Sequence, residues 1–220
     1  MTGPKAVLGR VAVLAAGLSA CALVALGAPA SAGDTSSIDH VQLANGRRVA
    51  ILVSVPGAAQ IDLGSVNVKI DGQSVKAVAQ NAADSSVRRT SVLAFDTSDS
   101  MAGAKFQQAK AAALSYLNAV PGSVYVGIVS FDARVRVVQA PTQDRAAARR
   151  VIGALTLARQ TALNHGVMQA VTTVGTKGGR TILVLSDGVD TTSVPLAQVL
   201  SNVKGSGAKV DVVALQQSGT

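Results

Sequence analysis

The chain has 220 residues, of which 48% are hydrophobic and only 2% aromatic, and its formal net charge is +8. This length allows one domain of ordinary size with a smaller partner, and the core must be built mainly from Val, Leu, Ile and Ala. The basic residues are scattered and stacking aromatics are nearly absent, so the composition argues against nucleic-acid binding.

The first 32 residues have the pattern of an export signal. Lys5 and Arg10 precede an apolar stretch at 11–28, and Ala-Ser-Ala at 30–32 is typical of a cleavage site. We predict a signal peptide over 1–32 and a secreted or cell-envelope protein whose mature chain begins at Gly33. Two alternatives remain open. The apolar stretch is just long enough to be an uncleaved membrane anchor, and Leu-Ser-Ala before Cys21 resembles the lipobox of a lipid-anchored protein.

A polar linker at 33–37 leads into a segment whose residues alternate as they do in β-strands. About four short strands are expected between 38 and 82, with Asn45-Gly46 and Asp71-Gly72 as turns. So few strands cannot bury a sandwich core alone. We therefore expect either a small immunoglobulin-like fragment or an extension of the next domain's sheet. The polar stretch 82–89 is the expected domain boundary.

From residue 91 onward, the hydrophobic pattern alternates between buried strands and amphipathic helices. Strands are expected at 92–95, 124–132, 181–186 and 210–215, with an edge-like strand at 134–138. Helices are expected at 102–120, from 143 onward after a Thr142 cap, at 162–174 and around 196–203. This alternation predicts an α/β domain over 91–220, with a doubly wound, mostly parallel sheet and helices on both faces.

Side chains that bear oxygen stand where several of these elements begin or end. They are Asp96, Ser98 and Ser100 after the first strand, Thr161 before the third helix, and Asp187 after the strand at 181–186. Open α/β sheets bind their ligands beyond the carboxyl ends of the strands, so we expect these side chains to converge. Hydroxyls and water-bridged carboxylates suit a hard cation such as Mg²⁺. The alternative is that they are ordinary turn or helix-capping residues, above all Ser100 and Thr161.

The order and context of these residues resemble the von Willebrand factor type A (vWA) domain and its metal-ion-dependent adhesion site (MIDAS). The matching stretches are LAFDTSDSM at 93–101, QTAL at 160–163 and VLSDG at 184–188. The resemblance implies that the hydroxyls of Ser98, Ser100 and Thr161 bind the cation. It also implies that Asp96 and Asp187 bind directly or through water, and that a sixth position awaits an acidic group of a partner. Asp99 and Arg159-Gln160 stand where the family usually has glycine.

The resemblance implies that the protein is a binding module and not an enzyme. We expect an exported, metal-dependent protein-binding module that recognises an Asp or Glu of a protein ligand through Mg²⁺, or through Mn²⁺ or Ca²⁺. The alternative is a structural subunit of a cell-envelope or secretion-system assembly whose cation only stabilises the fold. The family normally continues with one more strand and a closing helix. We therefore expect the vWA-like domain to be C-terminally incomplete, with membrane association through the N-terminal segment or a missing C-terminal region.

Motifs for catalysis are weak in this chain. A serine, His165 and an aspartate follow one another in an order that differs from subtilisin, and the glycine before the serine is missing. The stretch 175–179 lacks the spacing and the hydroxyl of a phosphate-binding loop. A hydrolase is therefore a third and weaker reading, and His165 is expected to face solvent.

Overall fold

The computed structural model describes residues 9–16, 22–25, 36–44, 48–55, 61–85, 87–188 and 190–215. The chain divides into two compact units, residues 1–87 and 88–220. The division falls inside the polar stretch at 82–89 that the sequence indicated as the boundary.

The N-terminal unit is built from antiparallel strands in two sheets. One sheet has the strand order β3–β4–β1–β7 and the other the order β2–β5–β6. The strands are β1 (Gly9–Ala16), β2 (Ala22–Ala25), β3 (Ser37–Ala44), β4 (Arg48–Val55), β5 (Asn67–Ile70), β6 (Gln73–Val75) and β7 (Ala77–Asn81). A short 3-10 helix, Leu63–Ser65, precedes β5.

The predicted turn at Asp71-Gly72 joins β5 to β6. Both turn residues have positive φ angles, 49° and 79°, which a two-residue hairpin turn requires and which Asp and Gly tolerate. The strands on either side pair in register, with Ile70 opposite Gln73. The other predicted turn, Asn45-Gly46, lies outside the described residues, although β3 and β4 on its two sides do pair antiparallel.

This unit has a small hydrophobic core of its own. Ile51 and Val53 of β4 are buried together with Val68 of β5, and partly buried aliphatic side chains pack around them. Within the described part of the chain, the strands of this unit pair only with one another. The core explains how several short strands can hold together without a long, continuous sheet.

Two strands of the N-terminal unit lie inside the predicted signal peptide. In the full-length chain, the backbone of β1 pairs with β4 on one side and with β7 on the other, and β2 pairs with β5. The predicted cleavage site at 30–32, most of the linker at 33–37, and Cys21 all lie outside the described residues. The signal peptide and its alternatives therefore stay predictions.

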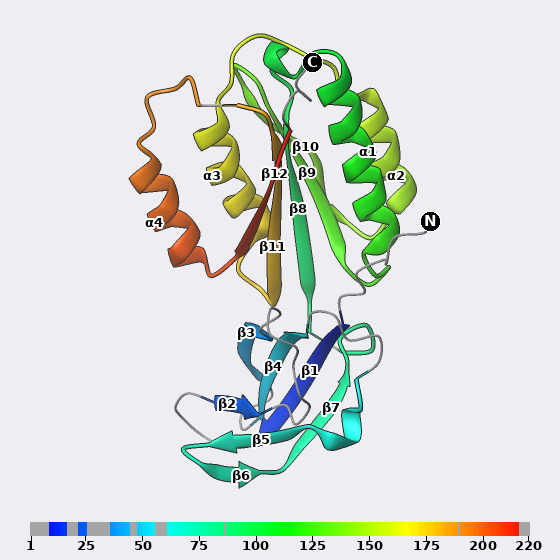
Figure 1. Cartoon of the computed structure of the whole chain (residues 1–220), viewed down its shortest axis with the longest axis vertical. Helices are drawn as coiled ribbons and strands as arrows, with labels where there is room; N and C mark the ends of the chain where they lie inside the picture. Colours follow the sequence, from blue (N-terminus) through cyan, green and yellow to red (C-terminus); the bar gives the residue numbers. More distant parts are fainter. Residues whose placement is uncertain are drawn as a thin grey trace, which may run out of the picture. The chain divides into compact units, whose positions relative to one another are not determined.

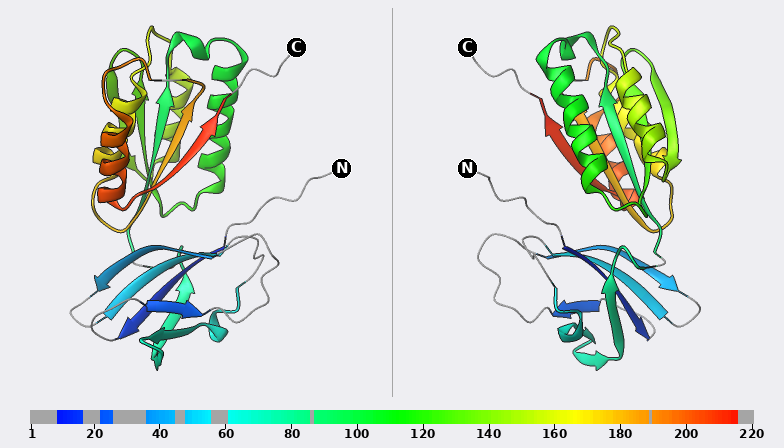
Figure 2. Two further views of the ribbon diagram at one scale, coloured as in Figure 1. Left: turned by 60° about the vertical axis from the view of Figure 1, so that its left-hand side comes forward. Right: turned by 90° about the vertical axis from the view of Figure 1, so that its right-hand side faces the viewer.

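The C-terminal unit is an α/β domain with one five-stranded sheet (Figures 1 and 2). The strand order is β10–β9–β8–β11–β12. The pairs β9–β8, β8–β11 and β11–β12 are parallel, and β10 joins the edge antiparallel to β9. The strands are β8 (Arg89–Asp96), β9 (Tyr125–Phe131), β10 (Val135–Thr142), β11 (Gly179–Ser186) and β12 (Lys209–Ala214). The predicted doubly wound, mostly parallel sheet is thus confirmed.

Helices cover both faces of this sheet, α1 and α2 on one side and α3 and α4 on the other (Figure 1). They are α1 (Ala104–Ala119), α2 (Arg145–Ala154), α3 (Leu163–Val174) and α4 (Leu196–Ser206). Along β8, Leu93 and Phe95 pack in the core on the α1 and α2 side, while Val92 and Ala94 pack in the core with α3. No helix in the described part of the chain is long and apolar enough to cross a membrane.

Two helices, α1 and α2, each begin two residues later than the sequence indicated. Residues Asp99–Met101 form a 3-10 turn, so α1 begins at Ala104. α2 begins at Arg145, because the side chain of Asp144 caps it by accepting a hydrogen bond from Ala147 N at 2.9 Å. The prediction of a Thr142 cap was wrong: Thr142 Oγ1 instead accepts a hydrogen bond from Asp144 N at 3.1 Å. Both residue types are good caps, and only the path of the chain distinguishes them.

Candidate metal site

Three parallel strands end level with one another at one edge of the sheet. Asp96, the last residue of β8, is in register with Phe131, the last residue of β9. On the other side of β8, Phe95 is in register with Leu185, which puts Ser186 at the end of β11 next to Asp96. The loops that follow these strands therefore start from the same edge, where open α/β sheets bind ligands.

Four of the five predicted ligands form a continuous series of hydrogen bonds at this edge. Asp96 Oδ1 accepts a hydrogen bond from Ser98 N at 2.9 Å. Ser98 Oγ lies 2.9 Å from Ser100 Oγ, and Ser100 Oγ donates to Asp187 Oδ1, also at 2.9 Å. The predicted convergence of these four residues is confirmed, while their role as metal ligands stays a prediction.

The capping alternative does not describe what these hydroxyls do. The N-cap position of α1 is Gly103, and Ser98, which precedes the 3-10 turn, makes no capping hydrogen bond with its side chain. The N-cap of α3 is Ala162 rather than Thr161, again without a side-chain cap. The two serine hydroxyls are directed at each other and at Asp187 instead.

Thr161 lies on a neighbouring loop that is tied to the same edge through its backbone. Ala158 N donates to Thr97 O at 2.8 Å, and Ala162 N donates to Asp132 O at 2.9 Å. Thr161 itself is buried, and its backbone N donates to Thr191 Oγ1 at 3.1 Å. Among the described residues, no hydrogen bond connects the Thr161 hydroxyl to the other four predicted ligands. The structure thus brings Thr161 to the edge but not into the hydrogen-bonded series.

The loop before Thr161 contains a strained residue. Gln160 has φ 66°, in the left-handed region that costs residues other than glycine roughly 1–2 kcal/mol. This is one of the positions where the family usually has glycine. The loop is held in place by Ala133 N, which donates to Arg159 O at 2.9 Å. Backbone strain of this kind persists where the surroundings impose it, and such places are often functional sites.

Close packing beneath the site depends on a glycine in α3. A Cβ atom at Gly166 would lie 2.5 Å from the ring of Phe131, which is the last residue of β9. Only a residue without a side chain lets the first turns of α3 approach the strand so closely. The preceding residue, His165, is exposed to solvent, as the sequence indicated.

Asp96 is completely buried at the centre of the site. Its second oxygen, Oδ2, accepts a hydrogen bond from Ser186 Oγ, a residue that the sequence analysis did not single out. Burial raises the pKa of Asp96 above its usual value. Hydrogen bonds from Ser186 and Ser98 oppose this rise, and the nearby charge of Asp187 adds to it. A buried carboxylate under this repulsion would be stabilised by a cation.

Asp190 is a second residue that sequence reasoning missed. Its Oδ1 accepts a hydrogen bond from Asn164 N in the first turn of α3 at 3.0 Å. Its Oδ2 accepts from both the backbone N and the hydroxyl of Thr192, at 3.0 and 2.6 Å. Asp190 therefore ties the loop after β11 to the start of α3, next to Thr161. Because Asn164 is 26 positions away from Asp190 in the sequence, no local pattern predicted this contact.

A further buried carboxylate supports the loop between β9 and β10. Asp132 accepts hydrogen bonds from Thr97 Oγ1 at 3.1 Å, from Arg134 N at 2.9 Å, and from both terminal nitrogens of Arg136 at 2.8 and 3.1 Å. Burial alone would raise the pKa of Asp132, but the hydrogen bonds from Arg136, Arg134 and Thr97 outweigh burial and lower it. Asp132 is thus an ionised anchor beside the candidate site.

The lowered pKa of Asp132 predicts that the stability of the protein falls at acidic pH. Because the pKa of Asp132 is lower in the folded protein than in the unfolded chain, its contribution to stability is present above the unfolded pKa. This contribution is lost as the pH falls through the folded pKa. Arg136→Gln removes the charged partner of Asp132. As the pH is lowered, the free energy of unfolding measured with urea should therefore begin to fall at a higher pH in this variant than in the wild type. Arg134→Gln is the matched control, because Arg134 donates to Asp132 only through its backbone. Identical pH profiles for Arg136→Gln and the wild type would contradict this role.

The donor set suits a small hard cation. Within the described ranges, no group of three or more His, Cys, Asp or Glu side chains comes together. The site instead offers two carboxylates and neighbouring hydroxyls. Adjacent ligands 2.0–2.1 Å from Mg²⁺ and at right angles to each other lie about 2.9 Å apart, which matches the 2.9 Å between Ser98 Oγ and Ser100 Oγ. The residues present therefore fit an octahedral cation bound by oxygen.

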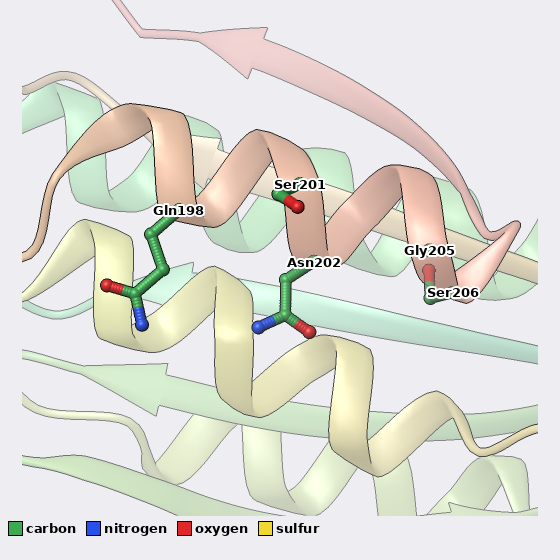
Figure 3. Close-up of a pocket in the computed structure, with 5 residues that line it drawn as sticks. All are labelled: Gln198, Ser201, Asn202, Gly205 and Ser206. Carbon is green, nitrogen blue, oxygen red and sulfur yellow. The ribbon is translucent and has the colours of Figure 1, made fainter.

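A pocket elsewhere on the domain is not related to this site. It lies along α4 and is lined by Gln198, Ser201, Asn202, Gly205 and Ser206 (Figure 3). These residues are neutral and include none of the predicted ligands, so the pocket offers no charged group to a cation or to an acidic partner.

Comparison with known proteins identifies the class of domain that this geometry suggests. The family model of the von Willebrand factor type A domain matches residues 91–189. This part of the chain is therefore a vWA domain. No curated protein sequence matches the chain significantly.

Solved structures share the fold. An aerotolerance-related membrane protein from Bacteroides fragilis superposes with a TM-score of 0.52 at 20% identity, over 58% of this chain and 67% of its own. A von Willebrand factor type A protein from Catenulispora acidiphila has a TM-score of 0.52 and 24% identity, over 63% of this chain and 34% of its own. Proximal thread matrix protein 1 from the mussel byssus, with a zinc-occupied MIDAS motif, has a TM-score of 0.50 and 17% identity, over 58% of this chain and 38% of its own. At these identities, the likeness shows the fold alone.

Proposed function

We propose that this protein is an exported binding module that recognises an acidic group of a protein partner through a divalent cation. The observation that carries the proposal is the hydrogen-bonded series from Asp96 through Ser98 and Ser100 to Asp187. Residues 87 positions apart in the sequence meet there, at the edge of the sheet where ligands bind. The family supports this reading, because vWA domains commonly mediate protein–protein interactions.

The residues have distinct parts in holding the cation. Ser98 and Ser100 would provide two hydroxyl oxygens and Thr161 a third, while Asp96 and Asp187 would provide negative charge directly or through water. When bound, the cation supplies a Lewis-acidic position that a carboxylate of the partner can occupy. Mg²⁺ is the first choice because it prefers oxygen ligands at the spacing of the two serines. Ser100 is exposed whereas Ser98 is buried, so Ser100 marks the side from which a partner can approach.

Exposed arginines beside the site favour an acidic partner. Arg134 lies in the loop after β9 and Arg159 in the loop before Thr161, and both are exposed. The hydrogen bond from Ala133 N to Arg159 O holds the two loops together. Neither arginine takes part in an ion pair in the part of the chain that the structure describes. Their positive charge would attract an acidic segment and raise its rate of association.

Calorimetric titration of the full chain with a short Asp-containing peptide tests the proposal. We expect the peptide to bind in Mg²⁺ and not in chelator, and the same peptide with Asn in place of Asp not to bind. Ser98→Ala should abolish binding, whereas Ser193→Ala, at an exposed position in the loop before α4, should not. Peptide affinity that does not respond to Mg²⁺ would rule out recognition through a cation. Stabilisation by Mg²⁺ without peptide binding would indicate a purely structural cation.

A further inference from the structure

The ammonium group of Lys105 lies against the candidate metal site. Lys105 belongs to the first turn of α1, and its Nζ donates hydrogen bonds to Asp187 Oδ2 and to Ser100 O, the latter at 3.1 Å. The ion pair is largely withdrawn from solvent, since the side chains of Lys105 and Asp187 are 18% and 4% exposed. Of the three ion pairs within the described ranges, this is the one that contains a predicted ligand.

The contact divides the two oxygens of Asp187 between different partners. Oδ1 accepts the hydroxyl of Ser100, and Oδ2 accepts the ammonium. Without a metal, the like charges of Asp96 and Asp187, which belong to one hydrogen-bonded series, repel each other. The positive charge of Lys105 offsets the charge of Asp187 in that state. A divalent cation at the same edge would meet the ammonium as a like charge.

We propose that Lys105 is a built-in counter-ion that competes with the divalent cation for Asp187. In the metal-free protein, Lys105 neutralises Asp187, and it gives up this contact when the cation binds. A lysine suits this exchange, because its compact ammonium sits on a flexible stem that can turn into solvent while the helix stays in place. The inference rests on the proposed function, since it requires the cation site, but it assigns a new role to a residue outside the ligand set.

The test variant removes the charge of Lys105 and keeps the aliphatic part of its side chain. In Lys105→Met, the apolar chain remains and the ammonium is lost, so we expect the dissociation constant for Mg²⁺ to fall by about tenfold or more, the change that removal of one close repulsive charge produces. The metal-free variant should melt at a lower temperature than the wild type, because Asp187 loses its partner. Lys177→Met is the matched control. Lys177 is exposed in the turn before β11, at the opposite end of that strand from the site.

Titration of the full-length variants with MgCl₂ alone, by calorimetry and by thermal melting, separates the outcomes. If the wild type shows no Mg²⁺ binding, the proposed function fails. If the wild type binds and Lys105→Met binds more weakly or equally well, Lys105 positions Asp187 instead of competing for it, and the inference is overturned. If Lys177→Met binds Mg²⁺ as much more tightly as Lys105→Met does, the effect reflects the net charge of the protein alone, and the inference is also overturned. Lys105→Arg keeps the charge and the fold, so a tighter site in that variant would refute the competition as well.

Discussion

We expect Mg²⁺ to stabilise this protein and Asp96→Asn to abolish that stabilisation. The asparagine keeps the shape of the side chain and an oxygen for Ser98 N, but it removes the buried negative charge. For a wild-type site at 100 times its dissociation constant, the lost stabilisation is roughly 2.7 kcal/mol. Thermal and urea unfolding in chelator and in saturating Mg²⁺ measure it directly.

The metal-free state of the same variant provides the decisive comparison. Because burial raises the pKa of Asp96 in the folded protein, its stability contribution is present below the unfolded pKa and is lost as the pH rises through the folded value. At neutral pH the charge therefore costs stability, and Asp96→Asn should be at least as stable as the wild type in chelator. Asp96→Ala differs, because Ser98 N and Ser186 Oγ lose their acceptor. That loss should cost about 1–3 kcal/mol in both buffers.

Asp84→Asn, which removes an exposed aspartate of the N-terminal unit, is the matched control for charge. It should leave the effect of Mg²⁺ unchanged. An Asp96→Asn variant that Mg²⁺ still stabilises, or that is equally destabilised in both buffers, would show that Asp96 is a structural acceptor and not part of a metal site.

Phe95→Ala should lower the free energy of unfolding by about 3–5 kcal/mol, the usual cost of removing a buried phenylalanine. Phe95 is fully buried in β8 and meets Phe106 of α1 edge to face, with ring centroids 5.9 Å apart. Because the side chain points into the core and not into the site, the loss should be the same in chelator and in Mg²⁺. Urea unfolding in the two buffers measures both quantities.

The neighbouring positions Phe95 and Asp96 therefore separate core stability from cation binding. Val212→Ala is the control for a truncated hydrophobic residue, since Val212 is 66% exposed on the edge strand β12 and should cost little. A loss in Phe95→Ala no larger than in Val212→Ala would contradict the placement of Phe95 in the core. A Mg²⁺ effect that disappears in Phe95→Ala, while the protein stays folded, would show that core and site are not independent.

Local sequence pattern predicted the fold of the C-terminal unit and most residues of its candidate site. Every residue of β8 is buried, which is why a continuous apolar run with covering helices predicted a central parallel strand. The carboxyl ends of parallel strands share one edge, so the sequence predicted that four residues lie close together there: Asp96, Ser98, Ser100 and Asp187. Composition was a weaker guide: the few aromatic residues suggested an aliphatic core, yet all three phenylalanines are buried in this unit.

Only the tertiary structure decided which partners complete the site. Lys105 reaches Asp187 across 82 residues and Ser186 reaches Asp96 across 90, and nothing in the residues next to them signals these contacts. Hydrogen bonds and ion pairs act over a few ångströms, so they depend on where the folded backbone places each side chain. Asp144 rather than Thr142 caps α2 for the same reason. Residue type and spacing predict which groups can bind, whereas the distance between their atoms determines which of them do.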